Sequence, residues 1–471
     1  MGTNAYLTDR KVPEAYTTAS HIMHFLHFVT KEETDELFVW TENGLESCGE
    51  ARVREEIEKD ANGYSSSFKK EVIRHIKDRT LVKAERFNPP PHLIPFANVT
   101  LDLTTGKEWT GKQTGLEDEE RFIIQNELAV EYDPEAPTPV EFINYLKRSQ
   151  PNADNRTRLL DHFASCLDRR NIRRRALLNV GRPYTGKTTF LKVEEALLGR
   201  ANCSNISLQE ICKGRFATSQ VYDKALNFYA DLPTVTIDPL DKFKVLTGGD
   251  SLQVEFKGRD SFPVSHHVKL HFSANLFPDV AKINDPGFWV RWDLVKWGVV
   301  STSEEEILPS LTEPRQLSGI ANMLLGILRR QRAEGFRIRP NDIEVKEAWL
   351  GETEPARSWL TQSCERDPNG FVLKQELYDL WESSYRIPQR SALVSQTRFN
   401  ELVRETLGAT EGRPLVAKAK QKRAWLGIRP KNSLTGLTGS YYSKGYGESY
   451  RIGENEKNPS NRSIVEREGA P

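Results

Sequence analysis

Hydrophobic residues recur along this chain with spacings that predict an alternation of buried strands and amphipathic helices. The run A-L-L-N-V at 176–180 is largely apolar, and runs of similar character occupy residues 225–231 and 268–275. Short apolar runs of this kind predict buried strands. Helices are predicted over residues 140–147, 156–167, 188–198 and 314–331, the last with Leu317, Ile320, Leu324 and Leu328 on one face. The pattern is typical of an α/β core, which we expect to span residues 141–340.

The residues before this core predict a region of mixed helix and strand. Residues 50–77 are charged, with apolar residues at helical spacing. Three consecutive prolines at 89–91 form a stiff connector, after which apolar residues alternate at Val99, Leu101 and Leu103 before Gly106. That alternation predicts a hairpin within residues 96–109. We therefore expect residues 1–140 to form an α+β N-terminal region.

After the core, residues 341–430 predict a small helical module that ends in a hairpin. Residues 371–381 and 395–407 each place apolar side chains on one helical face. The following segment, 417–429, contains no acidic residue, and its basic residues are Lys418, Lys420, Lys422, Arg423 and Arg429. Such a hairpin suits DNA phosphate, and a basic contact between subunits is the alternative. The polar composition of residues 431–471 predicts a disordered tail.

The clearest chemical signal is the sequence G-R-P-Y-T-G-K-T at 181–188, which follows one predicted strand and opens a predicted helix. This is the P-loop pattern, in which glycines let the backbone approach phosphate, the lysine reaches the β- and γ-phosphates and the threonine ligates Mg²⁺. An accidental glycine-rich turn is the alternative, and it would make the flanking strand and helix coincidences. The sequence therefore predicts that ATP and Mg²⁺ bind at Gly181, Thr185, Gly186, Lys187, Thr188 and Thr189.

Three further residues are candidates for chemistry on the bound nucleotide. Asp231 ends a predicted strand, where it could hold Mg²⁺ and polarise the attacking water, or only cap the next turn. Asn275 ends another strand, where it could contact the γ-phosphate or the water, or only form a turn before Pro278. Arg291 lies among aromatic residues and could be an arginine finger for a neighbouring subunit, or only form a cation–π contact.

Basic residues near the core are candidates for DNA contact. Lys244, Lys257 and Arg259 flank a Gly-Gly pair that suits a tight turn, and on a projecting hairpin they would follow a sugar-phosphate backbone. A solvated loop is the usual alternative. Residues 169–175 contain five arginines, which predict either a phosphate-contacting patch or a solvated subunit interface. We interpret His266, His267 and His271, on a predicted strand without nearby cysteines or paired acids, as structural rather than metal-binding.

Composition excludes some classes of protein and leaves others open. The 66 basic residues balance the 66 acidic ones, so a nucleic-acid partner cannot be inferred from net charge. Five scattered cysteines without a C-x-x-C pair argue against a zinc ribbon or a disulfide framework. No run approaches the length of a membrane span, and the N-terminus has no signal-peptide design, so we expect a soluble intracellular protein without a membrane partner.

Taken in order, these motifs resemble those of superfamily 3 helicases. The closer similarity is to the helicase half of phage/plasmid and poxvirus-type primase-helicases, whose K-x-L-T-G-G-D string is matched in full by residues 244–250. The resemblance covers most of residues 20–430 and is strongest over 176–292. It implies an α/β P-loop (AAA+-like) ATPase core, with Asn275 as sensor, Arg291 as arginine finger and residues 341–430 as a winged helix.

The resemblance also implies a function and partners. It predicts a DNA helicase that forms a homo-hexameric ring, uses ATP and Mg²⁺, and acts on single-stranded and forked DNA during replication of a virus, plasmid or mobile element. No recognisable primase site, with its paired Asp and His, occurs in the first 140 residues, so a separate primase is a candidate partner. A DNA-binding initiator that uses ATP as an assembly switch, and a small-molecule P-loop kinase, are the alternatives.

Overall fold

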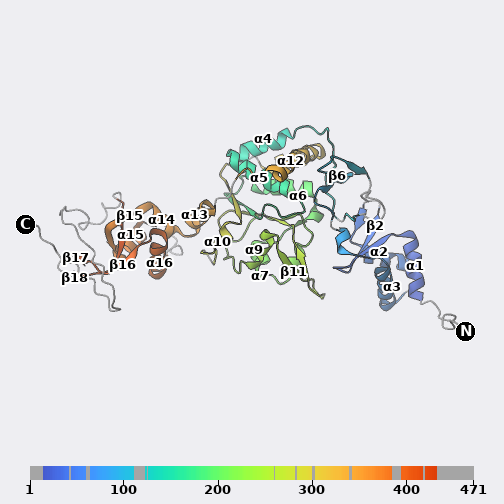
Figure 1. Cartoon of the computed structure of the whole chain (residues 1–471), viewed down its shortest axis with the longest axis horizontal. Coiled ribbons are helices and arrows are strands. Elements are labelled where there is room, and N and C mark those ends of the chain that lie inside the picture. Colours follow the sequence, from blue (N-terminus) through green and yellow to red (C-terminus); the bar gives the residue numbers. More distant parts are fainter. Residues whose placement is uncertain are drawn as a thin grey trace, which may run out of the picture. The chain divides into compact units, whose positions relative to one another are not determined.

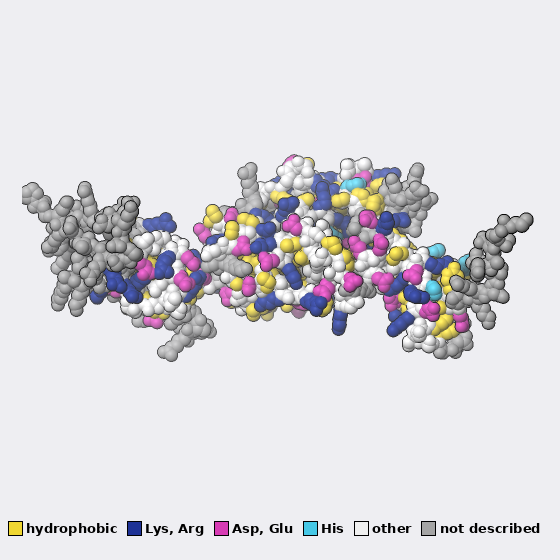
Figure 2. All heavy atoms as spheres, turned by 60° about the horizontal axis from the view of Figure 1, so that its bottom comes forward, with side chains coloured by type: hydrophobic (Ala, Val, Ile, Leu, Met, Phe, Trp, Pro, Cys, Tyr) yellow, Lys and Arg dark blue, Asp and Glu magenta, His cyan; other side chains and the backbone are white. Residues whose placement is uncertain are grey.

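The computed structural model describes residues 14–41, 44–59, 64–87, 89–110, 122–124, 126–258, 260–281, 284–299, 303–338, 342–384, 394–416 and 420–431. The chain divides into two compact units, residues 1–342 and 343–471 (Figure 1). Of the tail predicted over 431–471, only Lys431 is among the described residues. Figure 2 shows basic and acidic side chains interspersed on the face that it presents, as expected for a chain with balanced charge.

The first unit begins with a helical layer on a small sheet. Its sheet has the order β3-β2-β1-β4. The elements are α1 (Glu14–Phe25), β1 (Phe28–Lys31), β2 (Glu36–Thr41), β3 (Gly44–Glu46), α2 (Gly49–Glu58), α3 (Ser66–Arg79) and β4 (Leu81–Val82). The helical spacing predicted over 50–77 is present as α2 and α3, which bury Val53, Ile57, Val72 and Ile76 in one cluster.

A second small sheet follows a short 3-10 turn at Ala84–Phe87. It consists of β5 (Leu93–Pro95), β6 (Val99–Asp102) and β7 (Glu108–Thr110), all antiparallel, so the predicted hairpin is present. Leu101 and Leu103 belong to the same hydrophobic cluster as the core helices. This sheet is therefore packed onto the core of the first unit.

The core is a five-stranded sheet in the order β14-β8-β13-β10-β9, with every pair parallel. Its strands are β8 (Ala176–Gly181), β9 (Cys203–Ser204), β10 (Leu226–Tyr229), β13 (Lys269–Ala274) and β14 (Trp292–Trp297). After β8 the chain forms β9 at one edge of the sheet and then β10 and β13 between β9 and β8. It finally places β14 on the other side of β8, so the strand order reverses beside β8. Ligands of open α/β sheets bind at the carboxyl ends of the strands at such a point.

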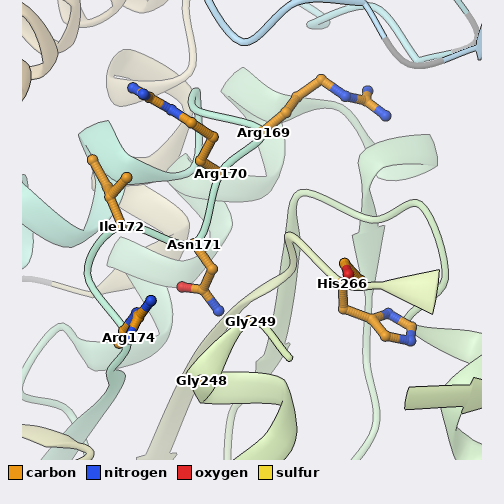
Figure 3. Close-up of a pocket in the computed structure, with 9 residues that line it drawn as sticks. Arg169, Arg170, Asn171, Ile172, Arg174, Gly248, Gly249 and His266 are labelled. Atoms are coloured by element: carbon orange, nitrogen blue, oxygen red, sulfur yellow. The ribbon is translucent and has the colours of Figure 1, made fainter. Parts of the chain in front are cut away.

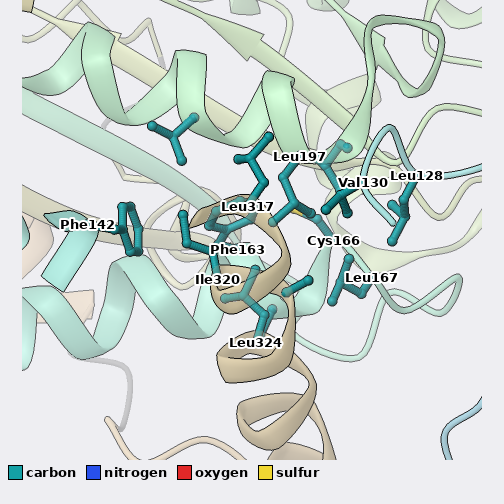
Figure 4. Close-up of a cluster of buried hydrophobic side chains, with 14 of the residues drawn as sticks. Leu128, Val130, Phe142, Phe163, Cys166, Leu167, Leu197, Leu317, Ile320 and Leu324 are labelled. Carbon is teal, nitrogen blue, oxygen red and sulfur yellow. The ribbon is translucent and has the colours of Figure 1, made fainter. Parts of the chain in front are cut away.

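Helices cover both faces of this sheet (Figure 1). One face carries α4 (Val140–Ser149), α5 (Ala153–Ser165), α6 (Lys187–Leu198), α11 (Glu304–Leu311) and α12 (Pro314–Glu334). Their apolar faces meet in a single cluster that includes Phe142, Phe163, Leu197, Ile320 and Leu324 (Figure 4). The amphipathic spacing predicted for these helices is therefore explained by one shared core.

The other face carries shorter helices and a hairpin. These elements are α7 (Leu208–Lys213), α8 (Ala217–Gln220), α9 (Asp241–Gly248), β11 (Ser251–Val254), β12 (Phe262–Ser265) and α10 (Pro286–Trp289). Phe243 of α9 stacks on Trp292 of β14, with ring centroids 4.8 Å apart. The antiparallel β11–β12 hairpin is inserted between α9 and the central strand β13.

Two local predictions were wrong. Residues 244–248 belong to helix α9, not to a loop, and the Gly-Gly pair ends that helix, with Gly249 at φ 75° as its left-handed C-cap. His266 and His267 lie between β12 and β13, so only His271 is on the strand. The Gly-Gly pair suited a helix end as well as a tight turn, and the histidines did not indicate where the strand begins.

The second unit combines helices with a three-stranded antiparallel sheet. The sheet order is β15-β19-β16, and a small β17–β18 ladder extends the hairpin. The elements are α13 (Asp342–Thr353), α14 (Pro355–Ser363), β15 (Cys364–Leu373), α15 (Lys374–Ser384), α16 (Gln396–Leu407), β16 (Thr410–Gly412), β17 (Leu415–Val416), β18 (Lys420–Gln421) and β19 (Ala424–Pro430). Leu377, Trp381, Phe399, Leu402 and Val403 are buried together, as their spacing predicted.

None of the helices in the described part of the chain combines the length and the apolar character needed to cross a lipid bilayer.

Gly181 is a point at which the sheet tolerates no side chain. A Cβ atom at this position would overlap the main-chain carbonyl oxygen of Trp297 in β14. Gly181→Ala is expected to lower the free energy of unfolding by about 2–4 kcal/mol, because two paired strands would have to move apart. Calorimetry of the full chain measures this loss.

Gly326→Ala is the matched control, because Gly326 is exposed on α12 and no atom lies within 4 Å of the position that its Cβ would occupy. It should leave the protein unchanged or stabilise it by up to about 1 kcal/mol. Equal effects of the two substitutions would contradict the packing argument.

Candidate functional site

The turn between β8 and α6 lies at the carboxyl edge of the core sheet. Gly186 adopts φ 96° and is the N-cap of α6, whose first turn receives no side-chain cap. The Thr185 hydroxyl donates to the carbonyl oxygen of Arg182 at 3.0 Å and closes the turn. The helix therefore begins with backbone N–H groups that lack a side-chain partner, and such a helix terminus attracts anions.

Lys187 lies across this turn. Its Nζ donates to the carbonyl oxygens of Gly181 at 2.7 Å and Arg182 at 2.8 Å, and lies 3.3 Å from Oδ1 of Asn275. The side chain is buried, and burial lowers the pKa of Lys187 although the Asp231 charge opposes the shift. A buried ammonium held mainly by neutral carbonyl oxygens is ready to exchange them for a phosphate.

Asp231 and Asn275 approach the same point from two neighbouring strands. Asp231 follows β10, Asn275 follows β13, and the Asn275 Nδ2 donates to Oδ1 of Asp231 at 3.2 Å. Both residues are exposed, whereas Thr188 is half-buried and Thr189 is buried on α6. The structure thus brings Lys187, Asn275 and Asp231 into one chain of contacts beside the start of α6.

Sequence reasoning missed the residues that support the turn from α4. The Tyr145 hydroxyl donates to the carbonyl oxygen of Gly186 at 2.6 Å. A Cβ at Gly186 would lie 3.2 Å from Oγ of Ser149 and 3.3 Å from the Tyr145 ring, which explains why this position takes glycine. Tyr145 is buried within an amphipathic helix, and nothing in its local sequence distinguishes it from an ordinary core aromatic.

Arg291 lies at the amino ends of the strands, whereas the turn lies at their carboxyl ends. It precedes Trp292, which pairs with Ala176 at the start of β8, whereas the turn follows Gly181 at the end of β8. Five strand residues separate the two levels by roughly 16 Å. The Arg291 Nη1 donates to the carbonyl oxygen of Gly287 at 2.6 Å, and its Nε donates to that of Lys244 at 3.2 Å. The structure therefore does not join Arg291 to the turn of its own chain.

Lys244 lies on α9, where its carbonyl oxygen contacts Arg291, and it is not part of the hairpin. Its Nζ forms an ion pair with Asp285 at 2.9 Å, and the Lys244 ammonium holds the pKa of Asp285 below its usual value. Lys257 is exposed in the loop that joins β11 to β12, while Arg259 lies outside the described residues. Tyr222 packs edge-on against Phe256 and Phe262 and supports the hairpin from below.

A single acid, distant in sequence, lies beside His271, and local sequence gave no sign of it. Glu194, His162 and His271 form a fully buried cluster whose ligand-type atoms all lie within 4.8 Å of one another. The His271 Nδ1 lies 2.6 Å from Glu194 Oε2, and burial lowers the pKa of His162 to about 4. Two ligands of one tetrahedral zinc ion are separated by about 3.3 Å, so the 2.6 Å contact is a hydrogen bond and the cluster fits a structural role.

In the second unit, the described basic residues of the predicted hairpin are in part exposed. Lys422 and Arg423 are exposed in the connection between β18 and β19. Lys420 is placed in β18, its side chain is outside the described part, and Lys418 lies outside the described residues altogether. Arg429 pairs with Glu365 at 2.7 Å, so its charge is partly offset by an acid from β15.

Two family models match parts of the chain. Residues 16–150 match the model described as D5 N terminal like, and residues 179–286 match the model described as Family of unknown function (DUF5906). Each covers less than a third of the chain. The first supports a relationship with phage-type primase-helicases, and the second includes the turn, Asp231 and Asn275 but ends before Arg291.

No curated protein matches the chain. Solved structures of the NrS-1 C terminal region resemble it over most of its length. The apo structure of residues 305–718 is 14% identical, covers 89% of this chain and 100% of that chain, and superimposes with a TM-score of 0.47. The A form apo structure is 12% identical, with the same coverage and a TM-score of 0.44.

Proposed function

We propose that this chain is an ATP-driven DNA helicase of the phage-type primase-helicase class, which acts in replication as a ring of identical subunits on single-stranded DNA. The observation that carries the proposal is the convergence of Lys187, Asn275 and Asp231 beside the N-terminus of α6. A cation, an amide and a carboxylate at this edge of a parallel sheet are the groups that phosphoryl transfer requires.

The residues present fit Mg²⁺-ATP. The backbone of residues 181–186 and the N-terminus of α6 would hold phosphate oxygens, and Lys187 would exchange its two carbonyl partners for the β- and γ-phosphates. The Thr188 hydroxyl and the Asp231 carboxylate would hold the metal ion, which neutralises developing charge. Asn275 would orient the attacking water or contact the γ-phosphate.

The placement of Arg291 supports shared sites between subunits. Because Arg291 lies at the amino edge of the sheet, about a strand length from its own turn, it suits contact with the nucleotide of a neighbour. A head-to-tail contact of this kind closes into a ring when it repeats by rotation. A homo-hexamer is the ring size that the family resemblance implies.

Two basic surfaces support a DNA partner. Lys257 is exposed at the tip of the β11–β12 hairpin. The hairpin is followed along the chain by β13, and Asn275 comes directly after β13. A movement of β13 on hydrolysis would thus reach the hairpin. The exposed Lys422 and Arg423 of the second unit suit duplex phosphate, as in a winged helix.

The test is unwinding of a forked DNA by the wild-type chain with ATP and Mg²⁺. Asp231→Asn is expected to lower ATP turnover and unwinding by about a hundredfold or more while nucleotide binding persists, because the metal loses its anionic ligand. Asp154→Asn, which removes an exposed carboxylate on α5, is the control and should retain both activities. ATP-dependent DNA binding without strand separation would favour an initiator, and turnover by a monomer that DNA does not stimulate would favour a small-molecule kinase.

A further inference from the structure

A cavity of about 510 Å³ lies at the base of the β11–β12 hairpin, away from the nucleotide turn. Its lining includes Arg169, Arg170, Asn171 and Arg174 on one side, and the Gly248–Gly249 end of α9 and His266 on the other. Figure 3 shows the arginine loop facing the end of α9 and His266 across this space. Within the described residues, no carboxylate lines the cavity.

The loop that carries the arginines is held rigidly. The buried Lys269 Nζ donates to the carbonyl oxygens of Asp168, Arg170 at 3.0 Å and His267 at 2.8 Å. The Asn171 Nδ2 donates to the carbonyl oxygens of Leu246 at 2.8 Å and Thr247 at 3.3 Å, which fastens the loop to α9. A binding loop fixed in advance loses less conformational entropy when a ligand arrives.

Positive charge exceeds negative charge in this network. Arg169 and Lys31 share Asp223, with contacts of 2.9 and 2.8 Å, and Arg170 and Arg332 share Asp168, each at 2.9 Å. Lys269 bonds only to the carbonyl oxygens named above, and Arg174 forms no ion pair among the described residues. Both carboxylates lie outside the lining of the cavity, whereas three of these cationic side chains, Arg169, Arg170 and Arg174, belong to it. The excess favours an anion, and guanidinium groups bind phosphate with two parallel hydrogen bonds.

The position of the cavity indicates the kind of phosphate. β12 ends at Ser265, which lines the cavity beside His266, and the same hairpin presents Lys257 at its tip. A single-stranded nucleic acid that contacts Lys257 at the tip can therefore continue along the hairpin to the cavity at its base. Apart from His266, the described residues of the lining contribute no aromatic ring on which a base could stack, so the site would hold backbone phosphate and leave the bases outside.

We propose that this arginine-lined cavity binds a backbone phosphate of single-stranded nucleic acid. The proposal rests on the proposed function only for its DNA partner, and it does not require nucleotide hydrolysis. Arg174 is its most direct test, because it is exposed and carries no ion pair among the described residues whose loss would disturb the fold. Arg174 adopts φ 53°, a region that asparagine tolerates well, so Arg174→Asn removes the charge with little backbone strain.

The experiment measures binding of a single-stranded oligonucleotide to the full chain by fluorescence anisotropy over a range of salt concentrations, without ATP. Arg174→Asn is expected to weaken binding by about 3–10-fold and to reduce the slope of log affinity against log salt by about 0.7, the value for one lost phosphate contact. Arg174→Lys should retain the slope. Arg148→Ala, an exposed arginine on α4, is the control and should match the wild type.

The outcomes separate this proposal from the proposed function. A wild-type chain that binds no single-stranded DNA would overturn the DNA partner and the cavity together. A chain that binds DNA equally well with Arg174→Asn would overturn the cavity alone. Inorganic triphosphate forms the second arm, measured in a Lys187→Ala background so that the turn between β8 and α6 contributes little. If Arg174→Asn then abolishes triphosphate binding but leaves oligonucleotide binding unchanged, the cavity holds a free polyphosphate and the nucleic-acid proposal is wrong.

Discussion

Lys187→Ala is expected to lower ATP turnover by at least about a hundredfold, because the substitution removes the only ammonium that the structure places across the turn between β8 and α6 among the described residues. In the proposed reaction the Lys187 ammonium would contact the transferred phosphoryl group, and that contact would strengthen as negative charge develops there. Nucleotide affinity should also fall, since the same ammonium would neutralise the β- and γ-phosphates. A steady-state ATPase assay and a fluorescent-nucleotide titration measure the two effects.

Lys192→Ala provides the matched control. Lys192 lies on the same helix, α6, but it is exposed and is not part of the contacts between Lys187, Asn275 and Asp231. Its replacement should leave turnover within about twofold of the wild type, as is usual for a surface lysine. If the two variants lost activity equally, or if Lys187→Ala retained it, the nucleotide would have to bind elsewhere.

The parts of the site that follow from local sequence could be predicted. An apolar run, a glycine-rich turn and a lysine at the start of a helix are consecutive, so their arrangement depends on backbone geometry alone. The positions of Asp231 and Asn275 after neighbouring strands were also predicted, because polar residues at the ends of apolar runs lie at the same edge when the strands are parallel. Their roles remain predictions. The helices of the core were predicted from apolar residues at helical spacing, and their apolar faces meet in one cluster.

The parts that depend on tertiary contacts could not be predicted. Tyr145 reaches Gly186 over 41 positions, and His271 meets Glu194 over 77, so no spacing rule connects them. The Gly-Gly pair after Thr247 suits both a tight turn and a helix C-cap, and the packing of Phe243 on Trp292 favours the helix. The arginines of 169–175 left two interpretations open, and the cavity that they line appears only once the hairpin is placed against them.

Arg291 tests whether the nucleotide sites are shared between subunits, because it lies at the amino ends of the strands, away from the turn of its own chain. If Arg291 acts as an arginine finger, Arg291→Ala is expected to lower ATP turnover by about a thousandfold or more while each subunit still binds nucleotide. The hydrogen bonds that Arg291 now makes are to the carbonyl oxygens of Gly287 and Lys244, so its loss should change folding stability much less than it changes activity. Calorimetry and the ATPase assay separate the two.

Mixed subunits distinguish a finger that acts on a neighbour from one that acts on its own chain. In an equal mixture of Lys187→Ala and Arg291→Ala chains, about a quarter of the interfaces of a randomly assembled ring would join an intact Lys187 to an intact Arg291. Turnover should therefore recover to roughly a quarter of the wild-type rate if those sites act independently. A site completed within one chain cannot recover in this way, since every chain in the mixture carries a defect. Absence of recovery, in a mixture shown by sedimentation to form mixed rings, would exclude shared sites and leave Arg291 with a structural role, joining α9 to α10.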